Sequence, residues 1–556
     1  MTPDPPETTT SPPVHSIDHR QLTGSSKLLC DYCHAFDRLE PFFAGSPLDP
    51  AMWQRAIRSR QTRPGPHAEI SSVLVAQLRA RGAPPKAVAA ARSLESPGTV
   101  AIVTGQQAGL FGGPLFTLLK ALTAIKLARR ASDEHGVAVV PVFWVHAEDH
   151  DLDEISSCAV LTEDFTHHRV TVPHDPGSGL PASEMQLTDS ITDVLADLRQ
   201  ALPETEFSDA LFEQLSRAYR PAAGMVDAFS RWMDSLLGEL GLVVFDASDP
   251  AAKPLVRSIL AHELQAPRET SALAIRAGED LVALGYHAQV TPSTDGTGLF
   301  YLDGRRQPIR LATGSTPGHD SFEVGTETVT ADELRAQAAD RPDLFSPNVL
   351  LRPIIQDAMF PTVGYVAGPS ELAYLAQLRG VYGRFDIPMP VIYPRASATI
   401  VDAATLRFLG RYDVKFELLQ PQDDAVLNRL LADLLPEAVE QALSQAEQTV
   451  GERLAAVASA VSAVDPTLVG AVETTRGRVE RDVKNLRNKV IQAAKRRDAT
   501  LRRQFHRARA QAFPGGEPQE RSVGGIYFLN RYGPHLVTRL LEDLPLEVGH
   551  HWLLTV

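Results

Sequence analysis

The chain has 556 residues, of which 44% are hydrophobic and 22% charged, which suits a folded protein of roughly two to four domains. Its formal net charge of −14 argues against a surface built to bind nucleic acid. The three cysteines are too few for a disulfide framework, and the chain shows neither a signal peptide nor an apolar run of membrane-spanning length, so we expect a cytoplasmic protein outside the membrane.

The N-terminal part of the chain divides into a tail and a helical region. Residues 1–20 are rich in Pro and Thr and are predicted to be disordered. Residues 21–159 are predicted to hold several helices and then the first half of an α/β core. Cys30 and Cys33 form a CxxC pair that could be half a zinc site or a redox pair, but no second ligand pair follows at zinc-finger spacing, which favours an incidental pair.

The most informative stretch runs from Thr99 to Glu154. Residues 99–104 are apolar and β-branched and predict a buried strand, and a Gly-rich loop follows it. Pro114 suits the first turn of the helix that comes next, and residues 137–145 predict a second strand. Because ligands bind beyond the carboxyl ends of the strands of an open parallel sheet, both loops after these strands are candidate site elements.

The rest of the chain is predicted to complete this core and to add a helical domain. Residues 160–345 are assigned to insertions and core strands, with a hairpin turn at Asp303-Gly304. Residues 346–420 form the second half of the core, in which a strand, a Gly-Pro turn and a helix repeat the earlier pattern. Residues 421–513 carry coiled-coil spacing, and residues 514–556 are expected to return to the core.

Candidate binding residues follow the ends of the predicted strands. The Gly-rich loop matches neither the Walker A nor the dinucleotide pattern, so the alternatives are a ligand cradle and a tight turn. The second Gly-Pro turn is expected to present a helix N-terminus to the same site. The candidates for binding substrate or nucleotide are Gly105, Gln106, Gln107, Gly109, Gly112, Gly113, Pro114, Gly368, Ser370, Glu371, Tyr393 and Arg395.

Candidate catalytic residues lie in the cluster HAEDHDLDE, residues 146–154. His146, Asp149, His150 and Asp151 are the candidates for acid–base chemistry, and the two histidines could carry protons near neutral pH. Carboxylates also suit Mg²⁺, although the sequence assigns no set of metal ligands. The alternative is a solvated acidic loop.

A strongly basic helix lies in the coiled-coil region. Between Ala471 and Ala510 there are 13 Lys and Arg residues against 4 Asp and Glu. This helix is interpreted either as a solvated coiled-coil face or as an electrostatic surface for phosphate groups.

Five motifs together resemble one family. TGQQAGLFGGPLFTLLKALTAIKLA, PVFWVHAEDHDLDEI, GYVAGPSELAYLAQL, MPVIYPR and GIYFLNRYGPHLV, in this order, are similar to the BshC family of bacillithiol biosynthesis. The resemblance covers about residue 25 to the C-terminus, and the N-terminal tail and the CxxC pair lie outside the five motifs.

The resemblance implies a fold and a reaction. The implied fold is an α/β, Rossmann-like and nucleotidyltransferase-like core with connecting-peptide insertions and a long antiparallel coiled coil that forms a homodimer. The implied reaction joins L-cysteine to the glucosamine amine of glucosaminyl-malate, and the resemblance also implies ADP at a second pocket near the coiled coil. Because a carboxylate is a poor acyl donor, we expect ATP to activate it, with Mg²⁺ as a candidate ion. The chain has neither a KMSKS-type loop nor a HIGH tetrapeptide, which leaves the use of ATP open. The alternative functions are a nucleotide-binding dimeric scaffold or regulator and, because of the basic helix, a tRNA-binding, synthetase-like protein.

Overall fold

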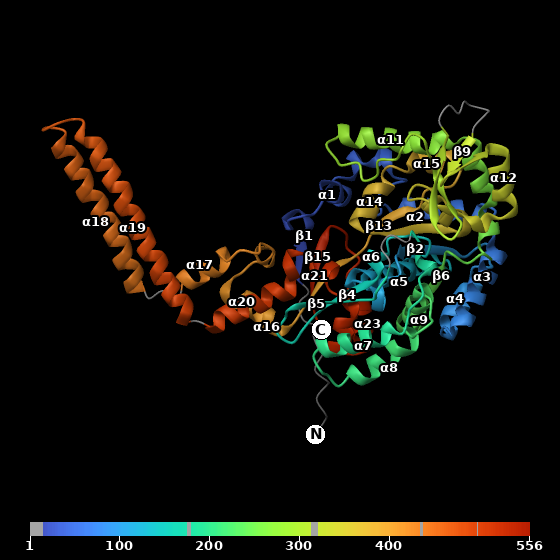
Figure 1. Ribbon diagram of the computed structural model, residues 1–556, viewed down its shortest axis with the longest axis horizontal. Coiled ribbons are helices and arrows are strands. Elements are labelled where there is room, and N and C mark those ends of the chain that lie inside the picture. The colour runs from blue at the N-terminus through green and yellow to red at the C-terminus, as the bar shows by residue number, and fades with distance from the viewer. Residues whose placement is uncertain (1–14, 175–178, 313–320, 434–436, 498) are drawn as a thin grey trace, which may run out of the picture. The chain divides into compact units, whose positions relative to one another are not determined.

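The computed structural model describes residues 15–174, 179–312, 321–433, 437–497 and 499–556 (Figure 1). The chain divides into two compact units. The first comprises the chain up to Ile400 together with Gln519–Val556, and the second comprises Val401–Pro518. The second unit therefore extends beyond the residues 421–513 that the sequence assigns to the coiled coil.

The first unit is built around a parallel five-stranded sheet with the strand order β13-β12-β2-β3-β6. Its strands are β2 (Val100–Gln106), β3 (Val139–Val145), β6 (Val243–Asp246), β12 (Thr362–Ala367) and β13 (Val391–Pro394). They are rich in Val and Ile and buried on both faces, as expected for a parallel sheet covered by helices on either side. The sheet confirms the predicted Rossmann-like core.

Alternate strand residues pack against different helices. Ala101 and Val103 belong to the same hydrophobic core as α3 (His67–Arg81) and α4 (Pro85–Ser93). Ile102 packs on the opposite face. There it joins residues of α2 (Pro50–Thr62) and α5 (Leu115–His135).

The order of the strands reverses between β2 and β12. From β2 the chain passes through α5 to β3 and later to β6, whereas β12 and β13 lie on the other side of β2. Such a topological switch point leaves a crevice beyond the carboxyl ends of the strands, which is where open α/β sheets bind ligands.

The insertions form a second sheet with the order β10-β9-β8-β7-β11 and several helices. β7 (Gly296–Leu302) and β8 (Arg306–Leu311) form the predicted hairpin, whose Gly304 has a φ of 65°. The remaining bounds are β4 (Ser157–Leu161), β5 (His167–Thr171), β9 (Ser321–Val324), β10 (Glu327–Thr330), β11 (Phe345–Pro347), α7 (Ser190–Ala201), α10 (Arg257–Gln265), α11 (Pro267–Ala283) and α12 (Ala331–Asp340).

The helical region between residues 208 and 237 is interrupted and forms two helices, α8 (Ser208–Ala218) and α9 (Met225–Leu237). Pro221 lies between them and cannot donate a helical hydrogen bond, and Ala222 has a φ of 63°, which is outside the helical region.

The two ends of the described chain meet in a small sheet. β1 (His15–Asp18) pairs antiparallel with β15 (His550–Thr555), which also pairs with β14 (Ser397–Val401). The prediction of disorder for residues 1–20 is therefore wrong for residues 15–18, because an antiparallel partner strand satisfies their backbone groups. Residues 1–14 lie outside the described residues. The predicted return of the C-terminal segment is confirmed, since α22 (Gly525–Tyr532) and α23 (His535–Asp543) contact α5.

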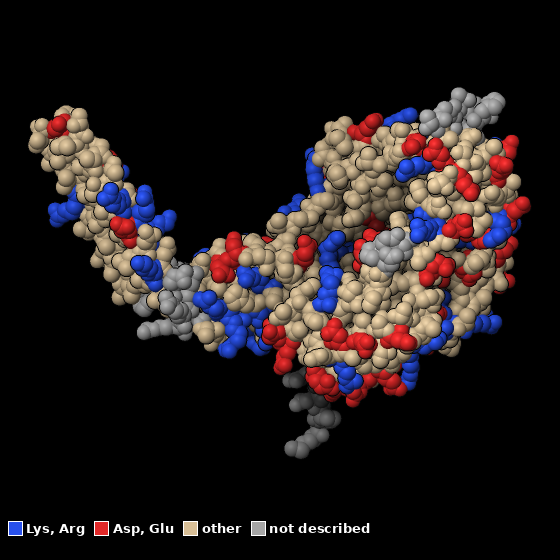
Figure 2. All heavy atoms as spheres, in the orientation of Figure 1, with Lys and Arg blue, Asp and Glu red and all other residues tan. Residues whose placement is uncertain are grey.

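The second unit is helical, with α16 (Ala403–Tyr412), α17 (Ala425–Asp433), α18 (Glu437–Val461), α19 (Leu468–Arg497) and α20 (Ala499–Ala512). α18 and α19 pack as a hairpin, and in the turn between them the Asp465 carboxylate accepts a hydrogen bond from the backbone N–H of Thr467 at 2.8 Å. Lys and Arg side chains gather along α19 and α20 (Figure 2). Among the described helices of both units, none has the length and apolarity to cross a membrane.

Candidate active site

A cavity of about 520 Å³ lies at the carboxyl ends of β2, β3 and β12, a volume typical of small-ligand pockets. Its position is the topological switch point of the sheet. The residues that line it are Gln106, Gln107, Phe116, Lys120, Trp144, His146, Ala147, Glu148, Asp149, Glu154, Ala247, Phe300, Arg306, Pro347, Asn348, Val349, Arg352, Gly368, Pro369, Ser370, Glu371, Tyr374, Arg395 and Arg521.

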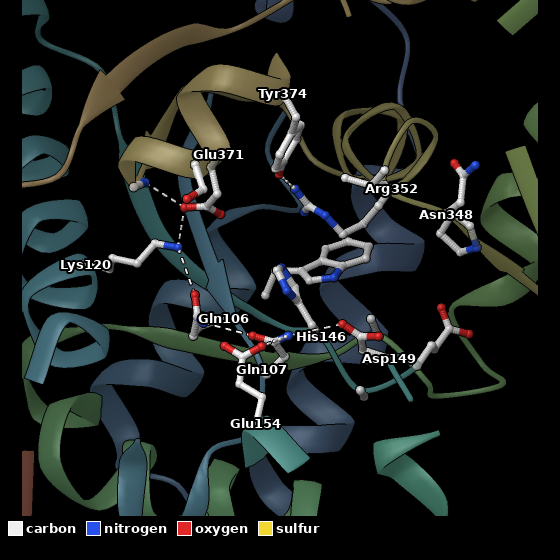
Figure 3. A pocket seen from close by; sticks show the side chains of 18 of the residues that line it. Gln106, Gln107, Lys120, His146, Asp149, Glu154, Asn348, Arg352, Glu371 and Tyr374 are labelled. Carbon is white, nitrogen blue, oxygen red and sulfur yellow. Dashed lines mark hydrogen bonds and ion pairs between the residues drawn. The ribbon is translucent and has the colours of Figure 1, made fainter. Parts of the chain in front are cut away.

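A buried ion pair lies at the centre of the pocket wall (Figure 3). The Lys120 ammonium, on α5, donates to a Glu371 carboxylate oxygen at 2.5 Å and to the Gly105 carbonyl at 2.5 Å. Glu371 stands in the first turn of α14 (Pro369–Leu375) and also accepts from the Tyr365 hydroxyl at 2.7 Å and the Gly368 N–H at 2.6 Å. Burial opposes the charge of Glu371, but Lys120 and these donors together hold its pKa below the ordinary value. The pair joins the β2–α5 half of the core to the β12–α14 half.

Two glutamines extend this network to the acidic cluster (Figure 3). The Gln106 side chain accepts from Lys120 at 3.3 Å and donates to Gln107 at 2.9 Å. The Gln107 amide then donates to Glu154 at 2.8 Å and to Asp149 at 3.2 Å. The orientation of both amides is therefore set by the ion pair at one end and by carboxylates at the other.

His146 is a neutral side chain in this pocket. Burial, together with the positive charges of Arg352, Lys120 and Arg306, lowers its pKa well below 6.5. Its Nε2 atom is buried with no hydrogen-bond partner among the described residues. Gly105 permits this packing, because a Cβ at that position would lie 2.9 Å from the same atom and 2.7 Å from the Trp144 carbonyl oxygen. The expectation that His146 carries protons near neutral pH is therefore wrong.

Two carboxylates in the pocket have different surroundings. Asp149 lies 3.5 Å from the Arg306 guanidinium and accepts from Gln107. Glu154, in the short helix α6 (Leu152–Ile155), has a raised pKa because its carboxyl group is desolvated and because Asp151 and Asp149 are nearby. A carboxyl group with a raised pKa is suited to accept a proton from a substrate near neutral pH.

Eight of the predicted site residues line the cavity. They come together from the loops after β2, β3, β12 and β13, and they are Gln106, Gln107, His146, Asp149, Gly368, Ser370, Glu371 and Arg395. Arg395 does not present a free charge to the pocket, because its guanidinium pairs with Glu520 through bonds of 2.6 and 2.9 Å.

The structure corrects the prediction that the Gly-rich loop binds a ligand. Gly109, Gly112, Gly113 and Pro114 are absent from the described cavity lining and form a tight turn, the alternative that the sequence left open. The Gly112 N–H donates to the Tyr219 hydroxyl at 3.2 Å, and a Cβ on Gly112 would lie 2.8 Å from the Trp232 indole nitrogen. These glycines serve close packing. Gly105 contributes its carbonyl to Lys120 without lining the cavity.

His150, Asp151 and Tyr393 are also absent from the described cavity lining. His150 is exposed at the margin, 3.1 Å from Arg306, and the Asp151 carboxylate accepts from the Glu154 N–H at the start of α6. Tyr393 is buried and donates its hydroxyl proton to the carbonyl of Leu546.

The sequence prediction missed several pocket residues, namely Phe116, Lys120, Glu154, Phe300, Arg306, Asn348, Arg352, Tyr374 and Arg521. Two of them had a readable signal: Lys120 is a charged residue among the apolar positions of a buried helix, and Glu154 lies in the cluster of residues 146–154. Arg306 reaches the pocket from the inserted β7–β8 hairpin, and only tertiary structure shows this. No group of three or more His, Cys, Asp or Glu side chains in the described ranges is arranged to hold a metal ion.

Comparisons with known proteins agree over the whole chain. The profile of the family "Bacillithiol biosynthesis BshC, N-terminal Rossmann-like domain" matches residues 14–396, and that of the "C-terminal coiled-coil domain" matches residues 398–556. A protein of Salinibacter ruber is 34% identical over 98% of both chains. One of Koribacter versatilis is 32% identical over 95% of this chain and 96% of its own, and one of Chlorobaculum tepidum is 34% identical over 81% and 82%. Each of the three is named "Putative cysteine ligase BshC".

The neutral state of His146 predicts a pH dependence of stability. Below pH 6.5 the unfolded chain binds a proton at this residue and the folded chain does not, so acidification favours unfolding. This residue should lower the free energy of unfolding by up to about 1.4 kcal/mol per pH unit as the pH falls. The free energy of unfolding, measured by urea unfolding between pH 7 and 5, should therefore depend less steeply on pH in His146→Gln than in the wild type.

The matched control is His150→Gln, an exposed histidine four residues away, which should keep the slope of the wild type. An equal slope for His146→Gln and the wild type would contradict the assignment of a neutral, buried imidazole.

Proposed function

The chain belongs to the BshC family of bacillithiol biosynthesis, and from this premise we propose that it is a ligase that joins the carboxyl group of L-cysteine to the glucosamine amine of glucosaminyl-malate. The single observation that carries the proposal is the cavity at the switch point of the sheet, which combines a neutral histidine, a carboxylate with a raised pKa and several cationic groups.

Amide formation requires that the cysteine carboxyl group be activated. A carboxylate is a poor acyl donor, and we propose that ATP supplies the activation. Negative charge then develops on the transferring phosphate and on the leaving group, where fixed donors stabilise it. The guanidinium group of Arg306 and the side-chain amides of Gln106 and Gln107 are donors of this kind in the pocket.

The attacking amine must lose a proton, and we assign its acceptance to Glu154. This carboxyl group lies in the cavity, its pKa is raised, and Gln107 holds one of its oxygens at 2.8 Å. Asp149, whose carboxylate lies 3.5 Å from the Arg306 guanidinium, would orient the amine. His146 would act as a hydrogen-bond partner of the substrate. His150 and Asp151 lie at the margin of the cavity.

The nucleotide and its ion are expected in the same cavity. Mg²⁺ is commonly held by one or two carboxylates together with substrate phosphates, and Asp149 is a carboxylate of this kind in the pocket. We propose that any Mg²⁺ enters with the nucleotide. We place the reaction in the cytoplasm, because the three cysteines of the described chain are unpaired, as a reducing compartment requires.

The helical hairpin supports the proposal of a homodimer. Four large apolar residues of α18, α19 and the turn between them are exposed, namely Val457 (45%), Val464 (82%), Leu468 (42%) and Leu486 (53%). Exposed apolar side chains on a coiled coil are candidates for burial against a second copy.

The direct test of the ligase is an assay with purified protein. Glucosaminyl-malate, L-cysteine and ATP, ADP or no nucleotide are incubated with the chain, and the products are weighed by mass spectrometry. We expect the amide-linked thiol with ATP. Absence of this product with every nucleotide would contradict the ligase and favour the nucleotide-binding scaffold.

Removal of the proposed base should lower turnover specifically. Glu154→Gln keeps the hydrogen bond with Gln107 but cannot accept the amine proton, so we expect kcat to fall by about 10²-fold or more. The control is Asp153→Asn, an exposed carboxylate of the same short helix that is absent from the described cavity lining. Equal kcat values for Glu154→Gln and Asp153→Asn would exclude Glu154 as the base.

A charge on the exposed apolar surface of α19 should break the proposed dimer. Leu486→Glu would bury a carboxylate in the interface, so light scattering should give the mass of one chain where the wild type gives two. Asn485→Glu introduces the same charge at the neighbouring exposed position and should remain dimeric. A wild type that is monomeric at micromolar concentration would contradict the dimer.

A further inference from the structure

The cations that line the cavity differ in how their charges are balanced. Lys120 is paired with Glu371, Arg395 with Glu520, and Arg306 lies 3.5 Å from Asp149. Arg521 also lines the cavity, but it is exposed to solvent. Arg352 forms no ion pair with an Asp or Glu side chain among the described residues, and its hydrogen-bond partners are all neutral. The Glu371 charge also acts on Arg352, but Glu371 is already paired with Lys120. Arg352 therefore stands out as a cation in a partly buried wall without a matching anion.

The neutral partners of Arg352 fix its orientation. Its guanidinium donates to the Gln356 side-chain oxygen at 3.0 Å, to the Tyr374 hydroxyl at 2.7 Å and to the Tyr365 hydroxyl at 3.4 Å. The Tyr365 hydroxyl donates a hydrogen bond to Glu371 at 2.7 Å, so the orientation of Arg352 is tied to the Lys120–Glu371 pair. Figure 3 shows Arg352 beside Tyr374 and above His146, facing the cavity.

The surroundings of Arg352 favour a planar anion. A guanidinium presents parallel N–H groups that match the two oxygens of a carboxylate. The Tyr374 hydroxyl accepts a hydrogen bond from Arg352, so its own O–H can donate to the bound carboxylate. His146 is uncharged at neutral pH and therefore neither repels Arg352 nor competes for its ligand.

We propose that Arg352 and Tyr374 form a carboxylate-binding subsite that anchors a substrate through an acid group. This inference rests on the proposed function for the identity of the substrates, both of which carry carboxylates. The acid group comes either from the malate part of the acceptor or from L-cysteine, and the two sources bind through the same chemistry.

The subsite can be tested by binding measurements without turnover. Calorimetric titrations of L-malate, L-cysteine, cysteamine and inorganic phosphate are run on the wild type, Arg352→Met and Arg352→Lys. We expect L-malate or L-cysteine to bind the wild type and Arg352→Met to weaken this binding by about tenfold or more. Arg352→Lys should recover only part of the affinity, because the ammonium lacks the planar fork.

The probes identify the source of the carboxylate. Loss of L-malate binding alone assigns the subsite to the acceptor. Loss of L-cysteine binding assigns the subsite to the cysteine carboxyl group, provided that the binding of cysteamine, which lacks this carboxyl group, is unchanged. Unchanged carboxylate binding in Arg352→Met, loss of phosphate binding only, or a wild type that binds neither acid would each overturn the proposal.

Thermal unfolding separates the subsite from a structural role. Since Arg352 has no anionic partner, Arg352→Met should keep or raise the unfolding temperature of the unliganded protein. Arg60 is the matched buried arginine outside the cavity. It donates to the backbone carbonyls of Thr362 at 2.9 Å, Asp357 at 2.8 Å and Pro388 at 2.6 Å, so Arg60→Met should lower that temperature.

Tyr374→Phe provides a second variant that leaves the charge in place. It removes one hydroxyl that orients Arg352 and should weaken the same ligand by a smaller factor. The titrations contain no nucleotide and form no amide, so the proposal of the subsite and the proposal of the ligase can fail independently. Binding through Arg352 with no amide product would reject only the ligase, and amide formation with unchanged binding in Arg352→Met would reject only the subsite.

Discussion

The ion pair between Lys120 and Glu371 is the interaction on which the candidate site depends. Two charges removed from water are stable only when their geometry and their remaining hydrogen bonds are satisfied. Here the ammonium has the Gly105 carbonyl and the carboxylate has Tyr365 and the Gly368 N–H. The pair thus connects the loop after β2 with the helix after β12, across the point where the order of the strands reverses. Hydrogen bonds through Gln106 and Gln107 connect the ion pair with Asp149 and Glu154.

This constraint divides the charged groups of the pocket by role. Lys120 and Arg395 are matched by buried carboxylates and hold the walls together, so neither is offered to a ligand. His146 stays neutral because the surrounding cations and burial disfavour its proton. Arg352, whose hydrogen-bond partners are neutral, is then the cation available to bind an anion, and Glu154, whose pKa is raised, is the group that can accept a proton. The proposed chemistry of amide formation needs both an anion-binding group and a proton acceptor.

The sequence predicted most of the core and only part of the site. Apolar β-branched runs and Gly or Pro punctuation located β2, β3, β12 and the 303–304 hairpin turn, because these signals are local. Gln106, Asp149 and Glu371 were found because they directly follow strands. Arg306 and Arg352 were missed since an inserted hairpin and a separate helix bring them to the cavity, which no local pattern encodes. Gly112 and Gly113 were misread because glycines required for packing against Trp232 and Thr117 look the same in sequence as glycines that cradle a ligand.

The most direct test of the central role of the ion pair is a double-mutant cycle on the free energy of unfolding, using Lys120→Met, Glu371→Gln and the combined variant. Each single change should lower stability by about 3 kcal/mol or more, since Lys120→Met leaves a buried carboxylate, and Glu371→Gln a buried ammonium, without its partner. The combined variant should lose clearly less than the sum, with a coupling of about 1–3 kcal/mol. Strictly additive losses would contradict the account, because they would mean that the two halves of the site are held together by other contacts.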